Sequence, residues 1–298
     1  MEFNNYTKQE KLMNAYNKIK ATLKQLSKSD TVDTMIVKKI TRLCTQHPEI
    51  LQVRAGDKKE NLGMIAAQHR IEWFVLMALD NEVASTQKNK FGCNIGMIAA
   101  KKGLENATLK ALDNPIASVQ QNYRGFNIGI LSALSKLEEA TLKALQNEEA
   151  SIQQDYNGFN IGMWASCNLL EQASLKALNN KKACQQQNFL GFNIGMYCAK
   201  YRMLSATLKS LENETASTQQ NQEGWNVGMF CVRKHFEIAI LKALRNSTAR
   251  TQRNQNGETI ASLAIKYGIY HSIEDILQAM EYDNNLDNLL PQANIGNG

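Results

Sequence analysis

The chain has 298 residues, and its hydrophobic fraction of 43% is enough for a continuous core, which argues against global disorder. Lys and Arg outnumber Asp and Glu by 34 to 28, a moderate basic excess that tolerates acidic partners without requiring them. The first residues lack the apolar segment of a secretory signal, and no apolar run is long enough to cross a membrane. Six cysteines occur without a Cys-x-x-Cys pair, so we expect a cytoplasmic protein with free thiols and no membrane span.

The N-terminal segment is predicted to be a helical cap. Residues 6–27 and 33–45 have the apolar spacing of amphipathic helices. Residues 43–56 also align with residues 76–89, one period further along the chain. We therefore expect residues 1–56 to form a cap that ends in a half-repeat and covers the first face of a repeat array.

A 33-residue period dominates the rest of the chain. A motif of the form Gly-x-Asn-Ile-Gly-Met, or a close variant, begins at Gly92, Gly125, Gly158, Gly191 and Gly224. Looser copies begin at Lys59 and Gly257. Self-similarity at a fixed period of this size is typical of stacked helical units that cannot bury their apolar faces alone. We expect an all-α solenoid of about seven repeats over residues 57–282.

Each unit is predicted to hold two antiparallel helices, a turn and a projecting loop. In one copy, residues 120–125 form a polar turn, and Asn127 stands where it can cap the first helix. A glycine within that helix recurs at 63, 96, 129, 162, 195 and 228, where close backbone approach would compensate its low helix propensity. Two further columns hold mainly small residues, one of them running Ala66, Ala99, Ser132, Ala165, Cys198, Cys231 and Ala264. The second helix begins near Leu104 and continues as Ala-Thr-Leu-Lys-Ala-Leu.

These features resemble the ankyrin repeat. Residues 92–103 match its glycine, its Ala-Ala pair and its second glycine, but Asn-Ile-Gly-Met replaces the Thr-Pro-Leu-His tetrad in most copies. The resemblance covers residues 57–280 and implies a divergent ankyrin-like array without the Thr–His network that ties ankyrin repeats together. A ladder through the Asn column and the Gln column is expected to replace that network; the Gln column is Gln87, Gln120, Gln153, Gln186, Gln219 and Gln252. A tetratricopeptide array is the alternative, but its Trp-x-x-Leu-Gly-x-x-Tyr signature is missing.

The C-terminal repeat is predicted to be a cap. Glu274 and Asp275 take positions that are apolar or basic in other repeats, as a face turned to water requires. Residues 283–298 are expected to form a flexible tail.

No enzyme or metal-site motif is present. The four histidines fall in different columns, and Cys231 near His235 belongs to the small-residue column. The segments outside the array are too short for an ordinary catalytic domain, so we expect no enzymatic activity, no cofactor and no metal. A thiol site near Cys167, Cys231 and His235 stays open as an alternative.

An aromatic and basic face is the candidate partner-binding surface. The residue after each turn glycine is aromatic in four copies, namely Phe126, Phe159, Phe192 and Trp225. The loop tips contribute Tyr123 and Tyr156, and the positions after Ala-Ala contribute Lys101, Lys102, Lys200, Tyr201, Arg233 and Lys234. Aromatic anchors beside cations suit an acidic, partly apolar protein. Loop-to-loop packing explains the same register equally well.

A second basic column runs along the second helices as Lys110, Lys143, Lys176, Lys209 and Lys242. Nearby glutamates favour a solvated, charge-balanced face, and a nucleic-acid or anionic-lipid surface is the alternative. We predict a monomeric, non-catalytic scaffold for a protein partner. The Asn-, Lys- and Ile-rich composition resembles that of AT-rich bacterial genomes, whose ankyrin-like arrays are often effectors that act on host enzymes in the host cytosol.

Overall fold

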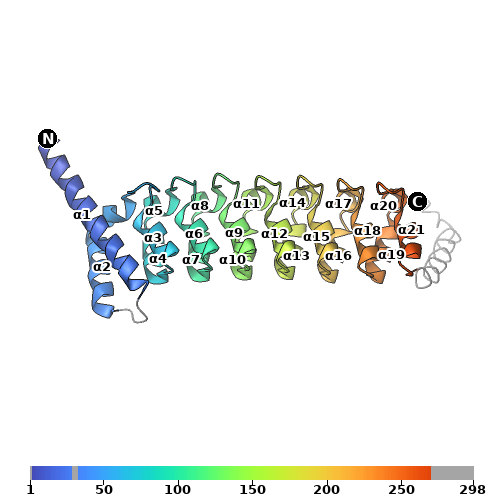
Figure 1. Cartoon of the computed structure of the whole chain (residues 1–298), viewed down its shortest axis with the longest axis horizontal. Helices are drawn as coiled ribbons and strands as arrows, with labels where there is room; N and C mark the ends of the chain where they lie inside the picture. The colour runs from blue at the N-terminus through green and yellow to red at the C-terminus, as the bar shows by residue number, and fades with distance from the viewer. Residues whose placement is uncertain (1, 29–32, 270–298) are drawn as a thin grey trace, which may run out of the picture. The chain divides into compact units, whose positions relative to one another are not determined.

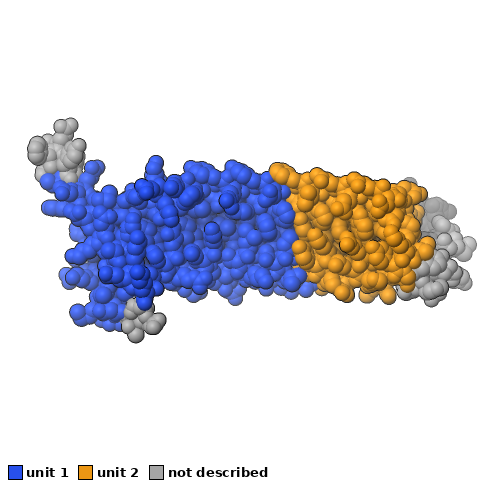
Figure 2. Space-filling view, viewed as in Figure 1, with its two compact units in different colours: residues 1–186 blue, residues 187–298 orange. Residues whose placement is uncertain are grey.

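The computed structural model describes residues 2–28 and 33–269. Within these ranges the chain consists of helices joined by turns, without a strand, which confirms the predicted all-α class. The chain divides into two compact units, residues 1–186 and residues 187–298, which Figure 2 distinguishes by colour. The predicted end of the array at residue 282, Glu274, Asp275 and the tail at 283–298 lie outside the described residues.

The N-terminal part of the first unit contains α1 (Glu2–Leu26), α2 (Thr34–Gln46) and the short 3-10 helix η1 (Pro48–Gln52). Helix α1 buries Tyr16, Ile19 and Leu23 and packs against α3 and η1. The Tyr16 hydroxyl donates a hydrogen bond of 2.8 Å to the Glu60 carbonyl, which ties α1 to the loop that precedes α3. Both helices predicted from the apolar spacing are therefore confirmed.

Each repeat that lies wholly within the described residues contains three helices, one more than the sequence predicted. In the first unit the first helices are α3 (Leu62–Gln68), α6 (Ile95–Lys101), α9 (Ile128–Leu134) and α12 (Ile161–Cys167). The second helices are α4 (Glu72–Leu79), α7 (Glu105–Ala111), α10 (Glu138–Ala144) and α13 (Glu171–Leu178). The additional third helices are α5 (Glu82–Thr86), α8 (Pro115–Val119), α11 (Glu148–Ile152) and α14 (Lys181–Gln185). Like helices of successive repeats contact one another, so the unit has three parallel layers of helices (Figure 1).

The second unit contains the same three kinds of helix. Its first helices are α15 (Ile194–Lys200), α18 (Val227–Arg233) and α21 (Ile260–Lys266). Its second helices are α16 (Leu204–Ser210) and α19 (Glu237–Arg245), and its third helices are α17 (Glu214–Thr218) and α20 (Ser247–Thr251). Helix α18 contacts both α15 and α21, so the 33-residue unit of sequence is also the unit of packing here.

The predicted Asn and Gln columns form a hydrogen-bonded ladder. In one copy, Asn94 Oδ1 accepts from the Met97 amide at 2.8 Å and so caps α6. Asn94 Nδ2 donates to the Ala117 carbonyl at 3.0 Å and to Gln120 Oε1 at 2.9 Å. Gln120 Nε2 in turn donates to the Thr86 carbonyl of the preceding repeat at 2.9 Å. Both units repeat this pattern, which we call the Asn–Gln ladder, and the prediction that it joins neighbouring repeats is confirmed.

The glycines inside the first helices make room for side chains of neighbouring helices rather than for their backbone. A Cβ placed on Gly129 would lie 2.7 Å from the Cβ of Ala144 and too close to Ile161 Cδ1 to be accommodated without movement. These atoms belong to the second helix of the same repeat and the first helix of the next. The predicted compensation for the glycine is therefore present, but it comes from side-chain packing, and the expectation of close backbone approach was wrong at this position.

Candidate interaction surface

In the first unit, the aromatic residues that follow the turn glycines are half-buried. The Phe159 ring stacks on the Trp164 ring of α12, with 4.6 Å between centroids and 26° between planes. Trp164 Nε1 donates to Asp155 Oδ2 at 2.9 Å, which fixes the indole ring in position. Phe126 packs against the apolar clusters around α6 and α9. One part of each ring therefore supports the fold, and the rest faces solvent.

In the second unit, the aromatic residues form a larger cluster. Phe192 stacks on Tyr197 at 5.1 Å and lies 5.4 Å from Phe230, and Trp225 also lies 5.4 Å from Phe230, all between ring centroids. The Tyr197 hydroxyl accepts a hydrogen bond of 2.8 Å from Asn188 Nδ2. The rings are thus held in fixed positions by stacking and, at Tyr197, by a hydrogen bond.

Cations lie over these rings. Lys200 Nζ is 5.3 Å from the Phe192 centroid and 5.7 Å from the Tyr201 centroid, and the Arg233 guanidinium carbon is 5.8 Å from the Trp225 rings. Lys200 and Arg233 are exposed, and Tyr201 is 38% exposed. Cation–π contacts of this length are favourable and keep each charge beside an apolar surface. We use the name ring column for these register positions in either unit: Phe126 and Phe159 in the first unit, and Phe192, Trp225, Lys200, Tyr201 and Arg233 in the second.

The basic residues predicted for the first unit stand at the end of α6. Lys101 is exposed, and Lys102, the C-cap residue of α6, is half-buried. Burial together with the positive charges of Lys24 and Lys102 lowers the pKa of His69, which caps the end of α3. In the second unit Lys234 caps α18 and is half-buried.

A further column of first-helix side chains supports the rings and was missed by the sequence analysis. It runs Ile98, Leu131, Trp164, Tyr197 and Phe230. The signal was available, because each of the last three lies five residues beyond an aromatic residue of the ring column. This stacking answers the question of packing or exposure left open by the sequence, because the rings are both packed and partly accessible.

The loop tips differ from the ring column. Tyr123 and Tyr156 are 66% and 67% exposed. Carbon Cδ1 of Tyr123 lies 3.2 Å from where a Cβ on Gly92 would stand, so this ring rests against the preceding loop. The residues predicted as one surface therefore fall into two sets that differ in packing and exposure.

The column of lysines on the second helices is charge-balanced, as predicted, but its partners differ from those expected. Lys110 and Lys143 each approach an aspartate of the preceding repeat, Asp80 and Asp113, at 2.6 Å. In the second unit, Lys209 and Lys242 both approach Glu212, at 2.8 Å and 3.1 Å. The hydrogen bonds from these two lysines lower the pKa of Glu212. Four of the five lysines of this column, all but Lys176, are thus engaged in ion pairs rather than presented as a field for polyanions.

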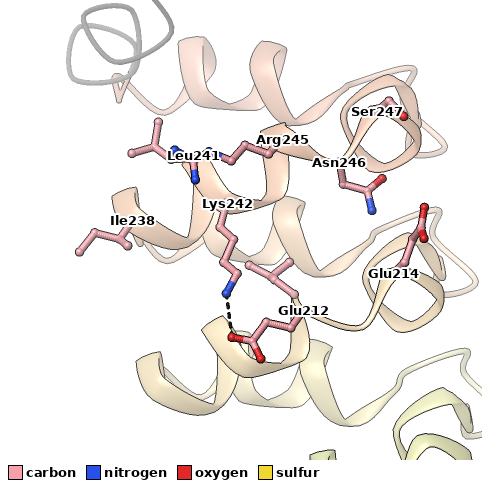
Figure 3. A pocket seen from close by; sticks show the side chains of 9 residues that line it. Glu212, Glu214, Ile238, Leu241, Lys242, Arg245, Asn246 and Ser247 are labelled. Carbon is pink, nitrogen blue, oxygen red and sulfur yellow. Dashed lines mark hydrogen bonds and ion pairs between the residues drawn. The ribbon is translucent and has the colours of Figure 1, made fainter. Parts of the chain in front are cut away.

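An open cleft of about 680 Å³ lies beside the Lys242–Glu212 pair (Figure 3). Its lining includes acidic and basic side chains, such as Glu212 and Arg245. It also includes aliphatic side chains, such as Ile238 and Leu241 of α19. The lysine and glutamate that face each other across it satisfy each other, so it presents no net charge that would select a ligand.

Four of the six cysteines, Cys44, Cys184, Cys198 and Cys231, are buried, and Cys93 and Cys167 are half-buried. Burial raises the pKa of Cys44 and of Cys184 to about 11, and it raises the pKa of the fully buried Cys231 further. The thiolate is the reactive form, so these side chains are inert at neutral pH. Within residues 2–28 and 33–269, no group of three or more His, Cys, Asp or Glu side chains is placed to hold a metal ion. In the same ranges no helix is long and apolar enough to cross a membrane.

No family model matches this sequence, and a comparison with curated proteins finds no relative.

Proposed function

We propose that the chain is a non-catalytic scaffold that binds a protein partner on the ring column. The single observation that carries this proposal is the pairing of half-buried rings with exposed cations, most clearly Phe192 with Lys200 and Trp225 with Arg233. Rings held by stacking lose little conformational freedom on binding, and aromatic and arginine side chains are the common anchors of protein interfaces. The neighbouring cations favour an acidic, partly apolar partner segment.

We further propose that the repeats form a divergent ankyrin-like solenoid of about seven units. The capped first helix, the polar turn with a glycine at φ near 78° and the 33-residue spacing support this assignment. The Asn–Gln ladder takes the role that the Thr–His network has in ankyrin repeats. The third helix of each unit occupies the segment for which the sequence predicted a loop. A monomer in a reducing cytosol, with six free cysteines, is part of the proposal.

The experiment is a quantitative pull-down from cell lysate with three forms of the chain. The test variant combines Phe159→Ala, Phe192→Ala and Trp225→Ala. A second variant, Lys200→Glu with Arg233→Glu, changes only exposed side chains and so leaves the core intact. The control, Lys181→Glu with Lys182→Glu, makes the same change in charge on two exposed residues of α14 that are not part of the ring column.

The proposal expects the control to recover the same partner as the wild type, and both ring-column variants to lose it. The charge variant is included because partial unfolding would by itself explain a loss of the partner by the triple ring variant. Equal recovery of the partner by the wild type and the charge variant would refute the proposal that the ring column binds it.

A further inference from the structure

Four loops of the first unit place exposed aromatic and basic side chains in register. These loops are residues 57–59, 90–91, 123–124 and 156–157, and we call them the tip row. Phe91, Tyr123 and Tyr156 are 51%, 66% and 67% exposed. Single exposed apolar residues are normal on a protein surface, but a row repeated at the same position of successive units is a patch that marks an interaction site.

The tip row is rigid, because each loop is hydrogen-bonded to its neighbour. The Tyr123 amide donates to the Phe91 carbonyl at 3.2 Å, and the Tyr156 amide donates to the Arg124 carbonyl at 3.1 Å. Gly125 has a φ of 78°, and a Cβ there would lie 2.7 Å from the Cα of Asp155 in the next loop. The rings therefore hold their positions before any partner arrives, and binding needs little ordering of the loops.

The charge of the tip row is positive. Its exposed cations are Lys58, Lys59, Lys90 and Arg124. The Lys90 ammonium lies 5.3 Å from the Phe91 centroid, so charge and apolar surface are adjacent. Asp57 is an exposed acid in these loops. Asp155 is buried and accepts from the Phe159 amide and from Trp164 Nε1, so its charge is turned into the repeat.

Two amide side chains beside the tip row, those of Asn122 and Gln121, serve the loops themselves, whereas Asn157 in the row is exposed. Asn122 Oδ1 accepts from the amides of Arg124 and Phe126, at 2.9 Å and 3.1 Å. Gln121 Nε2 donates to the carbonyls of Gly125 and Gln154, at 2.6 Å and 3.1 Å. The tip row thus presents rings and cations outward, while these amides face inward. A surface of this kind fits a partner that is anionic and has an apolar layer but no fixed pattern of hydrogen-bonding groups.

We propose that the tip row docks the first unit onto an anionic phospholipid bilayer. Tyr123 and Tyr156 enter the headgroup layer, where aromatic side chains with a polar edge are favoured, and Phe91 adds apolar surface to the same contact. The four cations contact lipid phosphate and carboxylate groups. This surface shares no residue with the ring column. The proposal goes beyond the scaffold function and does not depend on it.

The test is co-sedimentation of the full chain with vesicles of phosphatidylcholine alone or of phosphatidylcholine mixed with phosphatidylserine. The ring variant combines Phe91→Ser, Tyr123→Ser and Tyr156→Ser. The charge variant combines Lys58→Gln, Lys59→Gln and Lys90→Gln. The control combines Ile116→Ser and Ile238→Ser, which removes exposed apolar side chains, at 61% and 63% exposure, from outside the tip row.

We expect the wild type and the control to bind the phosphatidylserine vesicles and to bind pure phosphatidylcholine far more weakly. Each cation near an anionic surface strengthens binding about 5-fold, so the charge variant should bind on the order of 100-fold more weakly. Added salt should weaken wild-type binding in the same direction. The ring variant should lose binding although its cations are intact.

Three outcomes would overturn the proposal. These are wild-type binding that does not depend on phosphatidylserine, a ring variant that binds as the control does, and binding of single-stranded RNA by a wild type that ignores both kinds of vesicle. Thermal unfolding of each variant shows whether the fold is kept. The pull-down with the same variants separates this surface from the ring column, because loss of vesicle binding with the protein partner retained leaves the scaffold function untouched.

Discussion

A substitution at Asn127 distinguishes two explanations of how the buried Asn column stabilises the repeat. The asparagine acts either as a helix N-cap alone or also as a member of the Asn–Gln ladder. Asn127 is fully buried and makes three hydrogen bonds. Its Oδ1 accepts from the Ile130 amide at 2.7 Å, and its Nδ2 donates to the Ala150 carbonyl at 3.0 Å and to Gln153 Oε1 at 2.9 Å. Asn127→Asp keeps the shape of the side chain and the capping oxygen but replaces the donor by a second acceptor.

The two explanations predict different changes in the free energy of unfolding. Asp and Asn are about equally good N-cap residues, so if Asn127 matters as a cap alone, Asn127→Asp changes the free energy of unfolding by ~0.5 kcal/mol or less. If the ladder matters, the substitution buries a carboxylate oxygen against two acceptors and leaves the Ala150 carbonyl with only the longer bond of 3.4 Å from the Gln153 amide. Each unsatisfied buried group costs about 1–3 kcal/mol, so we expect a loss of about 3 kcal/mol.

Urea unfolding followed by tryptophan fluorescence measures this difference, since Trp164 lies in the next repeat. Asn127→Thr is the companion variant, because Thr259 Oγ1 caps α21 by accepting from the Ser262 amide at 3.2 Å in the last described repeat. It should retain the cap and lose about 1–3 kcal/mol from the ladder. An Asn127→Asp variant as stable as the wild type would refute the ladder as the element that joins the repeats.

Three further substitutions test local features of the repeat by their effect on the free energy of unfolding in urea. The buried Nδ2 of Asn221 has no hydrogen-bond partner, whereas Asn188, one period earlier, donates to the Tyr197 hydroxyl, and Phe230 stands where Tyr197 does. Phe230→Tyr should therefore supply the missing acceptor and stabilise the fold by about 1 kcal/mol, and a loss of stability would contradict this explanation. Leu169 has a φ of 64°, a left-handed conformation that costs a side-chain-bearing residue about 1–2 kcal/mol, so Leu169→Gly should stabilise the fold; an unchanged midpoint would show that this strain is absent. Gly129→Ala should destabilise by about 1–3 kcal/mol despite the better helix propensity of alanine, because its Cβ would meet that of Ala144 at 2.7 Å, and a gain of stability would disprove the close packing.

Much of the repeat could be predicted from the sequence, because its strongest constraints recur every 33 residues. The capping Asn column, the Gln column and the small residues of the first helix are identical or nearly so in most copies, and a buried hydrogen-bond network tolerates few replacements. The third helix was missed because it has only five residues. A helix of one turn has no apolar periodicity that a sequence pattern could reveal.

The turn between the first and second helices also escaped the sequence analysis. It needs a left-handed residue in every repeat. Glycine appears at that position only at Gly103 and Gly268, and the other repeats have Arg70, Lys136, Leu169, Arg202 and His235. Side chains that tolerate the strain hide the turn signal that glycine would have supplied. The ring column shows the same limit, since its register was visible but the stacking on Trp164 and Phe230 depends on packing across helices.

The central claim, that the ring column binds an acidic, partly apolar protein segment, is tested most directly by a binding titration with the partner recovered by the wild type. The variant Lys200→Glu with Arg233→Glu is compared with the control Lys181→Glu with Lys182→Glu, which carries the same net charge. We predict that the ring-column variant raises the Kd at least about tenfold, since removal of each interfacial charge typically costs 1 kcal/mol or more, and that the control stays close to the wild type. Equal Kd values for the two variants would contradict the account.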